Sequence, residues 1–247
     1  MPPEKKATRP DRAFPASGMP LVSETQPRGL AAEAYRTLRT NIQFASLDQP
    51  HRILIITSAS AGEGKTTTAA NFGVVNAQSG MRVVVIDADL RRPALHKIFG
   101  LPNTQGLTTA LLQDQPIASL AQRTRVKNLS VLTSGPTAPN PAELVGSKRM
   151  RQLLEHATAD FDLVLCDTPP IVAVADAVSL AAQCDGVIFV VRTGLVQYEV
   201  IRRTLGQIEA VKGRVLGVVL NNYDVRRDGY YYDYYRYVHS YYGEARK

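Results

Sequence analysis

The chain has 247 residues, of which 45% are hydrophobic, and a formal net charge of +7; this is enough material for one α/β domain with a full core. Its two cysteines lack C-x-x-C spacing and its four histidines are dispersed, which argues against a zinc site. The basic residues are scattered, so we expect no nucleic acid as a partner.

No apolar run approaches the ~18 residues of a membrane span, and no secretory signal is visible. We therefore expect a cytoplasmic protein, recruited to the inner face of the cell membrane through a partner.

Residues 1–28 are rich in proline and charge and carry no periodicity, so we predict a flexible N-terminal arm. Apolar residues then recur every four positions, the spacing of an amphipathic helix, at Leu30, Ala34, Leu38 and Ile42. On this helix Glu33, Arg36 and Arg39 follow one another at spacings of three. Neighbours at i and i+3 can form an intrahelical ion pair. Because steps of three drift across the helix surface, Arg39 would stay available to pair with another subunit.

The central part of the chain, residues 29–222, alternates strand-like and helix-like segments, which predicts an α/β fold. Such alternation implies a doubly wound, mostly parallel sheet flanked by helices. The predicted strands are Ile53–Thr57, Val83–Asp87, Leu129–Thr133, Leu163–Asp167, Val187–Val191 and Val215–Leu220. The predicted helices follow residue 64 and cover Ala142–His156, Ala175–Gln183 and Tyr198–Val211.

A phosphate-binding loop is predicted after the first strand, where the sequence reads Ala59-Ser-Ala-Gly-Glu-Gly-Lys65-Thr66. Small residues let consecutive amides turn toward phosphate oxygens, and the following helix directs its positive end to the same place. Lys65 would reach the β- and γ-phosphates of ATP, and the Thr66 hydroxyl would bind Mg²⁺. Ala59 replaces the usual first glycine without adding bulk. The residues expected to bind nucleotide are Ala61, Gly62, Glu63, Gly64, Lys65, Thr66, Thr67 and, at the end of the last strand, Asn221 or Asn222, of which we choose Asn222.

Acidic residues end two of the predicted strands. Asp87 and Asp89 follow one apolar run, and Asp167 ends another. Because ligands bind at the carboxyl ends of parallel strands, these carboxylates should converge with Lys65. A helix N-cap is the competing interpretation for Asp167 taken alone. The convergence of several such strand ends on one Gly-Lys-Thr loop favours a nucleotide site of the P-loop NTPase type.

Residues 223–247 form a tyrosine-rich segment that we predict to be a flexible tail. Stacking on single-stranded nucleic acid and a merely adhesive low-complexity tail are two alternatives. The interpretation that suits the nucleotide site is that the phenols accept phosphate, each transfer adding roughly two negative charges. The expected acceptors are Tyr230, Tyr231, Tyr232, Tyr234, Tyr235, Tyr237, Tyr241 and Tyr242.

Together these motifs resemble the bacterial tyrosine kinases (BY-kinases) of capsule and exopolysaccharide synthesis, from about Gly29 to the C-terminus. The resemblance rests on the phosphate loop, Asp87-Ala-Asp89, Asp167-Thr-Pro-Pro, Glu33-x-x-Arg36-x-x-Arg39, Pro139-Asn-Pro-x-Glu-Leu and the tyrosine tail. It implies a stand-alone autokinase that forms a ring through the Glu/Arg helix, phosphorylates a neighbour's tail in trans, and depends on a transmembrane chain-length-determinant adaptor.

The alternative is a regulatory P-loop ATPase of the MinD/ParA type. Those proteins carry a second lysine five residues before the loop lysine, where this chain has Ser60. Ala61 stands where many BY-kinases have proline, a departure that should affect only loop stiffness.

For the phosphoryl transfer we assign Lys65 and the amides of Gly62–Thr66 to the phosphates. Thr66, Asp167 and Asp87 would hold Mg²⁺. Asp87 or Asp89 would orient the incoming tyrosine and accept its proton, and the sequence favours Asp87 only slightly.

Overall fold

The computed structural model describes residues 18–45 and 50–224 and contains one seven-stranded sheet. The strands lie in the order β3-β4-β2-β5-β1-β6-β7, and all neighbours pair in parallel except β3 with β4. Their bounds are β1 Ile53–Ser58, β2 Val83–Asp87, β3 Gln122–Arg123, β4 Leu129–Leu132, β5 Leu163–Asp167, β6 Gly186–Arg192 and β7 Val215–Asn221. The predicted α/β sheet and its six parallel strands are confirmed. The two-residue β3 is too short to leave a sequence pattern.

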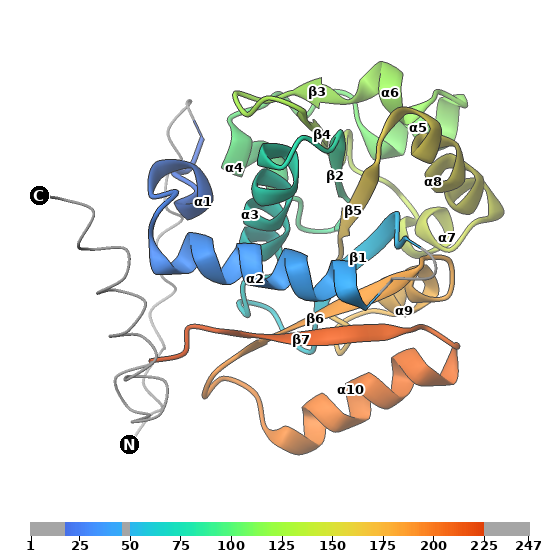
Figure 1. Cartoon of the computed structure of the whole chain (residues 1–247). Helices are drawn as coiled ribbons and strands as arrows, with labels where there is room; N and C mark the ends of the chain where they lie inside the picture. Colours follow the sequence, from blue (N-terminus) through green and yellow to red (C-terminus); the bar gives the residue numbers. More distant parts are fainter. Residues whose placement is uncertain (1–17, 46–49, 225–247) are drawn as a thin grey trace, which may run out of the picture.

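Helices cover both faces of the sheet (Figure 1). One face carries α1 Val22–Thr25, α2 Leu30–Phe44, α3 Lys65–Gln78 and α4 Leu95–Phe99. The other carries α5 Leu107–Gln113, α6 Ile117–Leu120, α7 Pro141–Val145, α8 Lys148–Asp160, α9 Asp176–Ala181 and α10 Tyr198–Ala210. Within the described ranges no helix has the length and apolar character needed to cross a bilayer.

The central strands β1, β2, β5 and β6 are apolar on both sides because each side packs against a helical layer. In β1, Ile53 and Ile55 belong to the core under α5–α10, whereas Leu54 and Ile56 belong to the core under α1–α4. Residues of alternate parity point to opposite faces of a strand, so a doubly covered strand has no position left for a polar side chain. The first polar groups occur where the strands end, and this places the chemistry at the carboxyl edge.

The single helix predicted for Ala142–His156 is wrong, because the structure has two helices there. The first ends at Val145, and Gly146 and Ser147 separate it from the second. The Ser147 hydroxyl accepts a hydrogen bond from the Met150 amide over 3.1 Å, which is the geometry of an N-cap. Ser147 therefore starts a new helix inside what looked like one continuous pattern.

Residues 18–28, predicted as part of a flexible arm, pack against the domain instead. Leu21 is buried in the core under α1–α4. The Ser23 amide donates to the Asn71 side chain of α3 over 3.0 Å. A single buried leucine within a polar, proline-rich segment has no periodicity to reveal it, so the sequence placed the boundary of the arm too far along the chain. Residues 1–17 lie outside the described residues.

Candidate active site

The loop between β1 and α3 has the backbone of a phosphate cradle. Gly62 and Gly64 adopt φ values of 81° and 98°, a region in which only glycine is unstrained. Gly64 is the N-cap of α3, and no side chain of the described residues caps the first amides of this helix. These amides are directed toward the loop, where an anion can accept their hydrogen bonds. Lys65, the first residue of α3, is buried with 8% of its surface exposed.

Glu63 fixes this loop through its side chain, a role that the sequence did not reveal. The side chain is fully buried. One carboxylate oxygen accepts from the Ser60 amide over 2.6 Å, and the other accepts from the Arg192 amide at the end of β6 over 3.1 Å. The carboxylate is thus directed into the protein, and the predicted contact of Glu63 with the nucleotide is the one made by its backbone amide.

Asn221, the last residue of β7, is a second support of the loop. Its side-chain amide donates to the Glu63 carbonyl over 2.8 Å. Its neighbour Asn222, which we had chosen to bind nucleotide, is exposed and adopts a positive φ of 56°. A positive φ is common for asparagine in turns, and the Asn222 amide donates to the Asn221 side chain over 2.9 Å, so a local bend accounts for its geometry.

Asp87 and Asp167 face each other at the ends of neighbouring strands. They are register partners in the pairing of β2 with β5, and their exposed fractions are 0% and 1%. One oxygen of Asp87 accepts from the amides of Ala94 and Leu95, each over 2.9 Å. The other oxygen of Asp87 and one oxygen of Asp167 are buried without a hydrogen-bond partner among the described residues.

The environment of these two carboxyl groups disfavours their charged forms. Burial, opposed by the two backbone hydrogen bonds, raises the pKa of Asp87 to about 7. Burial, and then the negative charge of Asp87, raises the pKa of Asp167 well above its usual range. A hydrogen bond with Thr66 and the positive charge of Lys65 act in the opposite direction on the pKa of Asp167. Two adjacent buried carboxyl groups, each with one oxygen that lacks a hydrogen-bond partner among the described residues, favour the binding of a cation.

The residues present fit a magnesium ion. Two orphaned carboxylate oxygens and the Thr66 hydroxyl are hard oxygen donors, and Mg²⁺ in nucleotide sites takes one or two carboxylates together with water and phosphate oxygens. No group of three or more His, Cys, Asp or Glu side chains that could hold a metal exists among the described residues. The site therefore suits an ion that arrives with a nucleotide better than one held by protein ligands alone.

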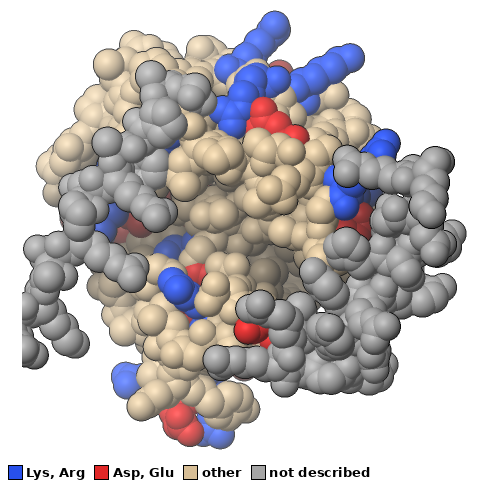
Figure 2. Space-filling model, turned by 90° about the vertical axis from the view of Figure 1, so that its left-hand side faces the viewer, with Lys and Arg blue, Asp and Glu red and all other residues tan. Residues whose placement is uncertain are grey.

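Asp89 lies two residues beyond the end of β2 and is half-buried. One of its oxygens accepts from the Arg92 amide over 2.9 Å and from the Arg91 amide over 3.3 Å. Asp89 thus belongs to a turn at the rim, whereas Asp87 lies below the rim. Viewed from the left-hand side of Figure 1, toward which β6 and β7 run, the surface is hollowed and holds both acidic and basic side chains (Figure 2).

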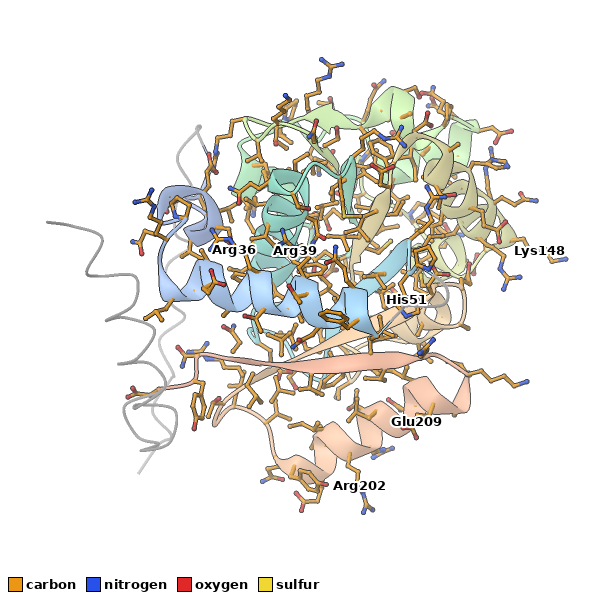
Figure 3. All side chains as sticks on the ribbon, in the orientation of Figure 1. Arg36, Arg39, His51, Lys148, Arg202 and Glu209 are labelled. Carbon is orange, nitrogen blue, oxygen red and sulfur yellow. The ribbon has the colours of Figure 1, made fainter. Side chains whose placement is uncertain are left out.

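The Glu/Arg motif of α2 engages partners within the chain. Glu33 and Arg36 form an ion pair of 2.7 Å, and Arg36 also donates to the Pro27 carbonyl. Arg39 donates to the Val75 carbonyl of α3 over 3.0 Å. Part of its guanidinium group is therefore engaged within the chain, whereas the sequence predicts that Arg39 is available to another subunit. Figure 3 shows Arg39 next to α3 and Arg36 nearer to α1.

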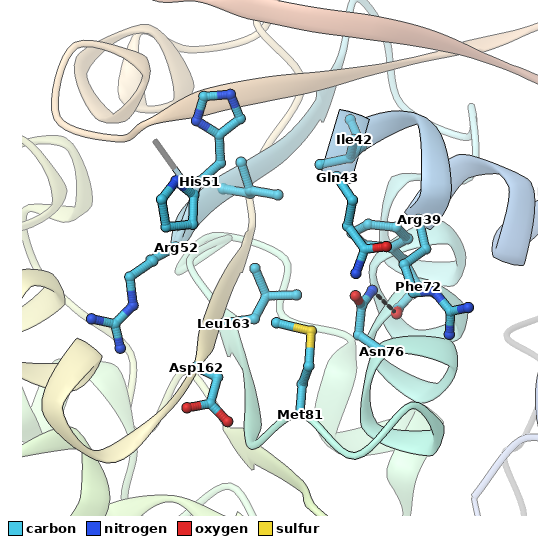
Figure 4. A pocket seen from close by; sticks show the side chains of 12 residues that line it. Arg39, Ile42, Gln43, His51, Arg52, Phe72, Asn76, Met81, Asp162 and Leu163 are labelled. Carbon is cyan, nitrogen blue, oxygen red and sulfur yellow. Dashed lines mark hydrogen bonds between the residues drawn. The ribbon is translucent and has the colours of Figure 1, made fainter. Parts of the chain in front are cut away.

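A cavity of about 200 Å³ lies away from these residues, between α2, α3 and the first residues of β1 and β5. Its lining includes Ile42, Phe72 and Leu163. In Figure 4 the guanidinium groups of Arg39 and Arg52 point away from its centre. It lies at the amino edge of the sheet, opposite the strand ends that carry Asp87 and Asp167, so it is separate from the candidate nucleotide site.

The expected phosphate acceptors in the tail, from Tyr230 to Tyr242, lie outside the described residues. The structure therefore brings together Lys65, Thr66, Asp87 and Asp167, and places Asp89 at the rim of the same edge.

Asp87→Asn should stabilise the protein in metal-free buffer at pH 8. The folded wild type keeps a proton on Asp87 up to about pH 7, whereas the usual pKa is 3.8. Its stability therefore falls as the pH rises between these values. The asparagine amide oxygen can keep the Ala94 and Leu95 hydrogen bonds without a charge. Urea unfolding should show a gain on the order of 2 kcal/mol at pH 8 and a smaller gain at pH 5. A variant less stable than wild type at pH 8 would contradict the electrostatic account.

Gly64→Ala should weaken Mg²⁺-ADP binding by at least roughly tenfold. A Cβ at this position would overlap the side-chain nitrogen of Asn221. Gly80→Ala is the matched control, because Gly80 has the same φ of 98° and no atom within 4 Å of an added Cβ. Both variants carry the strain of a left-handed alanine, and only the first distorts the loop. Calorimetry showing equal affinities for the two variants would exclude the proposed role of the loop.

Comparison with known proteins places this site in a family. The family profile named AAA domain matches residues 51–221. The tyrosine-protein kinase YwqD of Bacillus subtilis is 45% identical over 214 residues, covering 85% of this chain and 90% of the relative. The tyrosine-protein kinase wzc of Salmonella typhi is 36% identical over 89% of this chain, which spans only 31% of that longer relative. The solved kinase domain of the Escherichia coli tyrosine kinase ETK superposes with a TM-score of 0.79 at 36% identity, covering 87% of this chain and 84% of that one. The chain therefore belongs to the bacterial tyrosine-protein kinase family, with its phosphate loop and paired aspartates at the edge of a P-loop NTPase sheet.

Proposed function

We propose that this protein is an ATP-dependent tyrosine autokinase that phosphorylates its C-terminal tyrosine cluster in trans and regulates capsule or exopolysaccharide synthesis and export. The observation that carries the proposal is the buried Asp87–Asp167 pair beside Lys65. This arrangement suits a magnesium-bound triphosphate, and the family membership supplies the tyrosyl acceptor. The tyrosine-rich segment beyond Asp224 gives the chain acceptors of its own.

Phosphoryl transfer requires mainly positioning and neutralisation of charge. In this proposal the amides of Gly62–Thr66 and the ammonium group of Lys65 hold the β- and γ-phosphates. Thr66, Asp87 and Asp167 would hold Mg²⁺, whose charge neutralises the phosphate oxygens when the ion is bound. Because Glu63 is tied to Ser60 and Arg192, the loop keeps its shape before the nucleotide arrives.

The two candidates for the proton acceptor differ in accessibility. Asp87 is fully buried; one of its oxygens is engaged by backbone amides, and the other is buried without a hydrogen-bond partner among the described residues. Asp89 is half-buried at the rim. A tyrosine arriving from outside meets Asp89 first, so we assign Asp89 to orient the phenol and accept its proton, and Asp87 to the metal. A tyrosine has a pKa near 10, and a nearby carboxylate helps to receive its proton during transfer.

The partners are proposed on the same basis. Copies of the chain would assemble through Glu33, Arg36 and Arg39 into a ring, so that the tail of one subunit enters the site of its neighbour. A transmembrane chain-length-determinant adaptor would recruit the kinase to the inner face of the membrane.

Lys65→Met should abolish tail phosphorylation, because the variant loses the charge that binds the β- and γ-phosphates. After incubation with Mg²⁺-ATP, intact-mass spectrometry should show the wild type gaining several increments of phosphate and the variant none. Lys148→Met is the matched control, since Lys148 is exposed at the start of α8 (Figure 3). Isolated protein and protein with the adaptor segment should be assayed in parallel. ATP turnover without any gain in mass would instead identify a regulatory ATPase.

Replacing Glu33, Arg36 and Arg39 together by alanine should shift the protein to a smaller species in size-exclusion chromatography with light scattering. The matched control removes one glutamate and two arginines from α10, at Arg202, Arg203 and Glu209, all exposed. Both variants change the net charge equally. An unchanged mass for the α2 variant would exclude the motif as the assembly surface.

A further inference from the structure

The loops that follow β2 and β5 leave the sheet side by side. Their strands end at the register partners Asp87 and Asp167, and the Ala88 amide donates to the Asp167 carbonyl over 2.8 Å. The loop after β2 carries Asp89. The loop after β5 ends at Asp176, the first residue of α9.

An ion pair joins these two loops farther from the sheet. The Arg91 guanidinium, through Nε, donates to one carboxylate oxygen of Asp176 over 3.1 Å. The Asp176 side chain is 1% exposed and the Arg91 side chain is 41% exposed. The second oxygen of Asp176 is buried and has no hydrogen-bond partner among the described residues. A buried carboxylate satisfied so incompletely depends on its one arginine.

The segment that leads to Asp176 is hydrogen-bonded to the backbone at the start of the phosphate loop. The Ile171 amide donates to the Ser58 carbonyl over 2.9 Å, and the Val172 amide donates to the Ala59 carbonyl over 3.1 Å. The loop that ends at Asp176 is therefore fixed to the same backbone that begins the nucleotide cradle.

Arg91 connects Asp176 to Asp89, so the contact with Asp176 also helps to fix the orientation of the Asp89 carboxylate. The backbone amides of Arg91 and Arg92 donate to one oxygen of Asp89. The position of these amides sets the direction of the Asp89 carboxylate, and the position of Arg91 is set by Asp176. A connected path thus runs from the phosphate loop through Asp176 and Arg91 to the rim carboxylate.

We propose that Asp176 is a positioning residue for the phosphoryl transfer: it holds Arg91, and thereby holds the turn that directs Asp89 toward the incoming tyrosine. This inference rests on the proposed kinase function and on the role assigned there to Asp89. Asp176 does not contact the nucleotide in this account. Its loss should slow the transfer step and leave nucleotide binding intact.

The test uses the full-length protein and the variant Asp176→Asn. Single-turnover phosphorylation at saturating Mg²⁺-ATP should fall by roughly tenfold, as expected for a misplaced reacting group, and the Kd for Mg²⁺-ADP should stay within about twofold of wild type. Asp176→Glu, which keeps the charge, should recover part of the rate. Combining Arg91→Gln with Asp176→Asn should cost no more than the larger single effect, because both changes break the same path.

Asp162→Asn is the matched control. It removes a second Asp–Arg ion pair, 2.7 Å long, between Asp162 and Arg82 at the opposite edge of the sheet, and should leave the rate unchanged. Hydrogen exchange across residues 88–94 should increase in Asp176→Asn and stay as in wild type in Asp162→Asn.

The outcomes separate the two proposals. A wild type that gains no phosphate overturns the kinase function, and exchange across residues 88–94 still decides whether Asp176 holds the turn. An active wild type with an equally fast Asp176→Asn variant overturns the positioning role alone. A variant that loses rate and nucleotide affinity together also overturns it, because Asp176 would then act on the whole fold.

Discussion

The site depends on one constraint, the electrostatic repulsion between the buried carboxylates of Asp87 and Asp167. Parallel pairing of β2 with β5 places the two carboxyl groups opposite each other, and the helical layers on both faces keep water away. Two adjacent negative charges are costly in such a place. When no cation is present, protonation of Asp87, whose pKa is raised to about 7, removes one of the two negative charges. In the proposed function these carboxylates would hold Mg²⁺, and its binding would then be linked to proton release and would weaken as the pH falls.

The rest of the edge holds its groups rigidly around this pair. Glu63 connects the phosphate loop to the end of β6, and Asn221 connects it to the end of β7. On the other side Arg91 connects the loop after β2 to α9. Each tether joins segments that are distant in the sequence and adjacent at the carboxyl edge. Because these contacts are made within the chain, much of the ordering cost is met during folding and not at the moment of transfer.

The sequence predicts the parts of this architecture that leave a local pattern. Buried strands such as Val83–Asp87 are continuous apolar runs, and the phosphate loop has a fixed order of small residues before Lys65. Contacts between distant residues leave no such signal. Nothing near Glu63 indicates that Arg192 will receive its carboxylate, and nothing near Asp176 indicates Arg91. Capping chemistry was equally hidden, because Ser147 interrupts a helical pattern without changing its periodicity.

The end of β7 lies beside the phosphate loop, and this position bears on whether the tyrosines are phosphorylated within one chain or between chains. β7 ends at Asn221, whose side chain contacts the phosphate loop, so the tyrosine-rich segment after Asp224 starts at the catalytic edge. Fully extended, residues 225–247 could span at most roughly 80 Å, so reach alone permits transfer within one chain as well as between chains. In the proposed ring, a neighbouring subunit would supply tyrosines at a high effective concentration without requiring one chain to fold back sharply onto its own site. If transfer occurs in trans, as we propose, it would depend on the contacts of α2, and the helix that packs on α3 would also control phosphorylation.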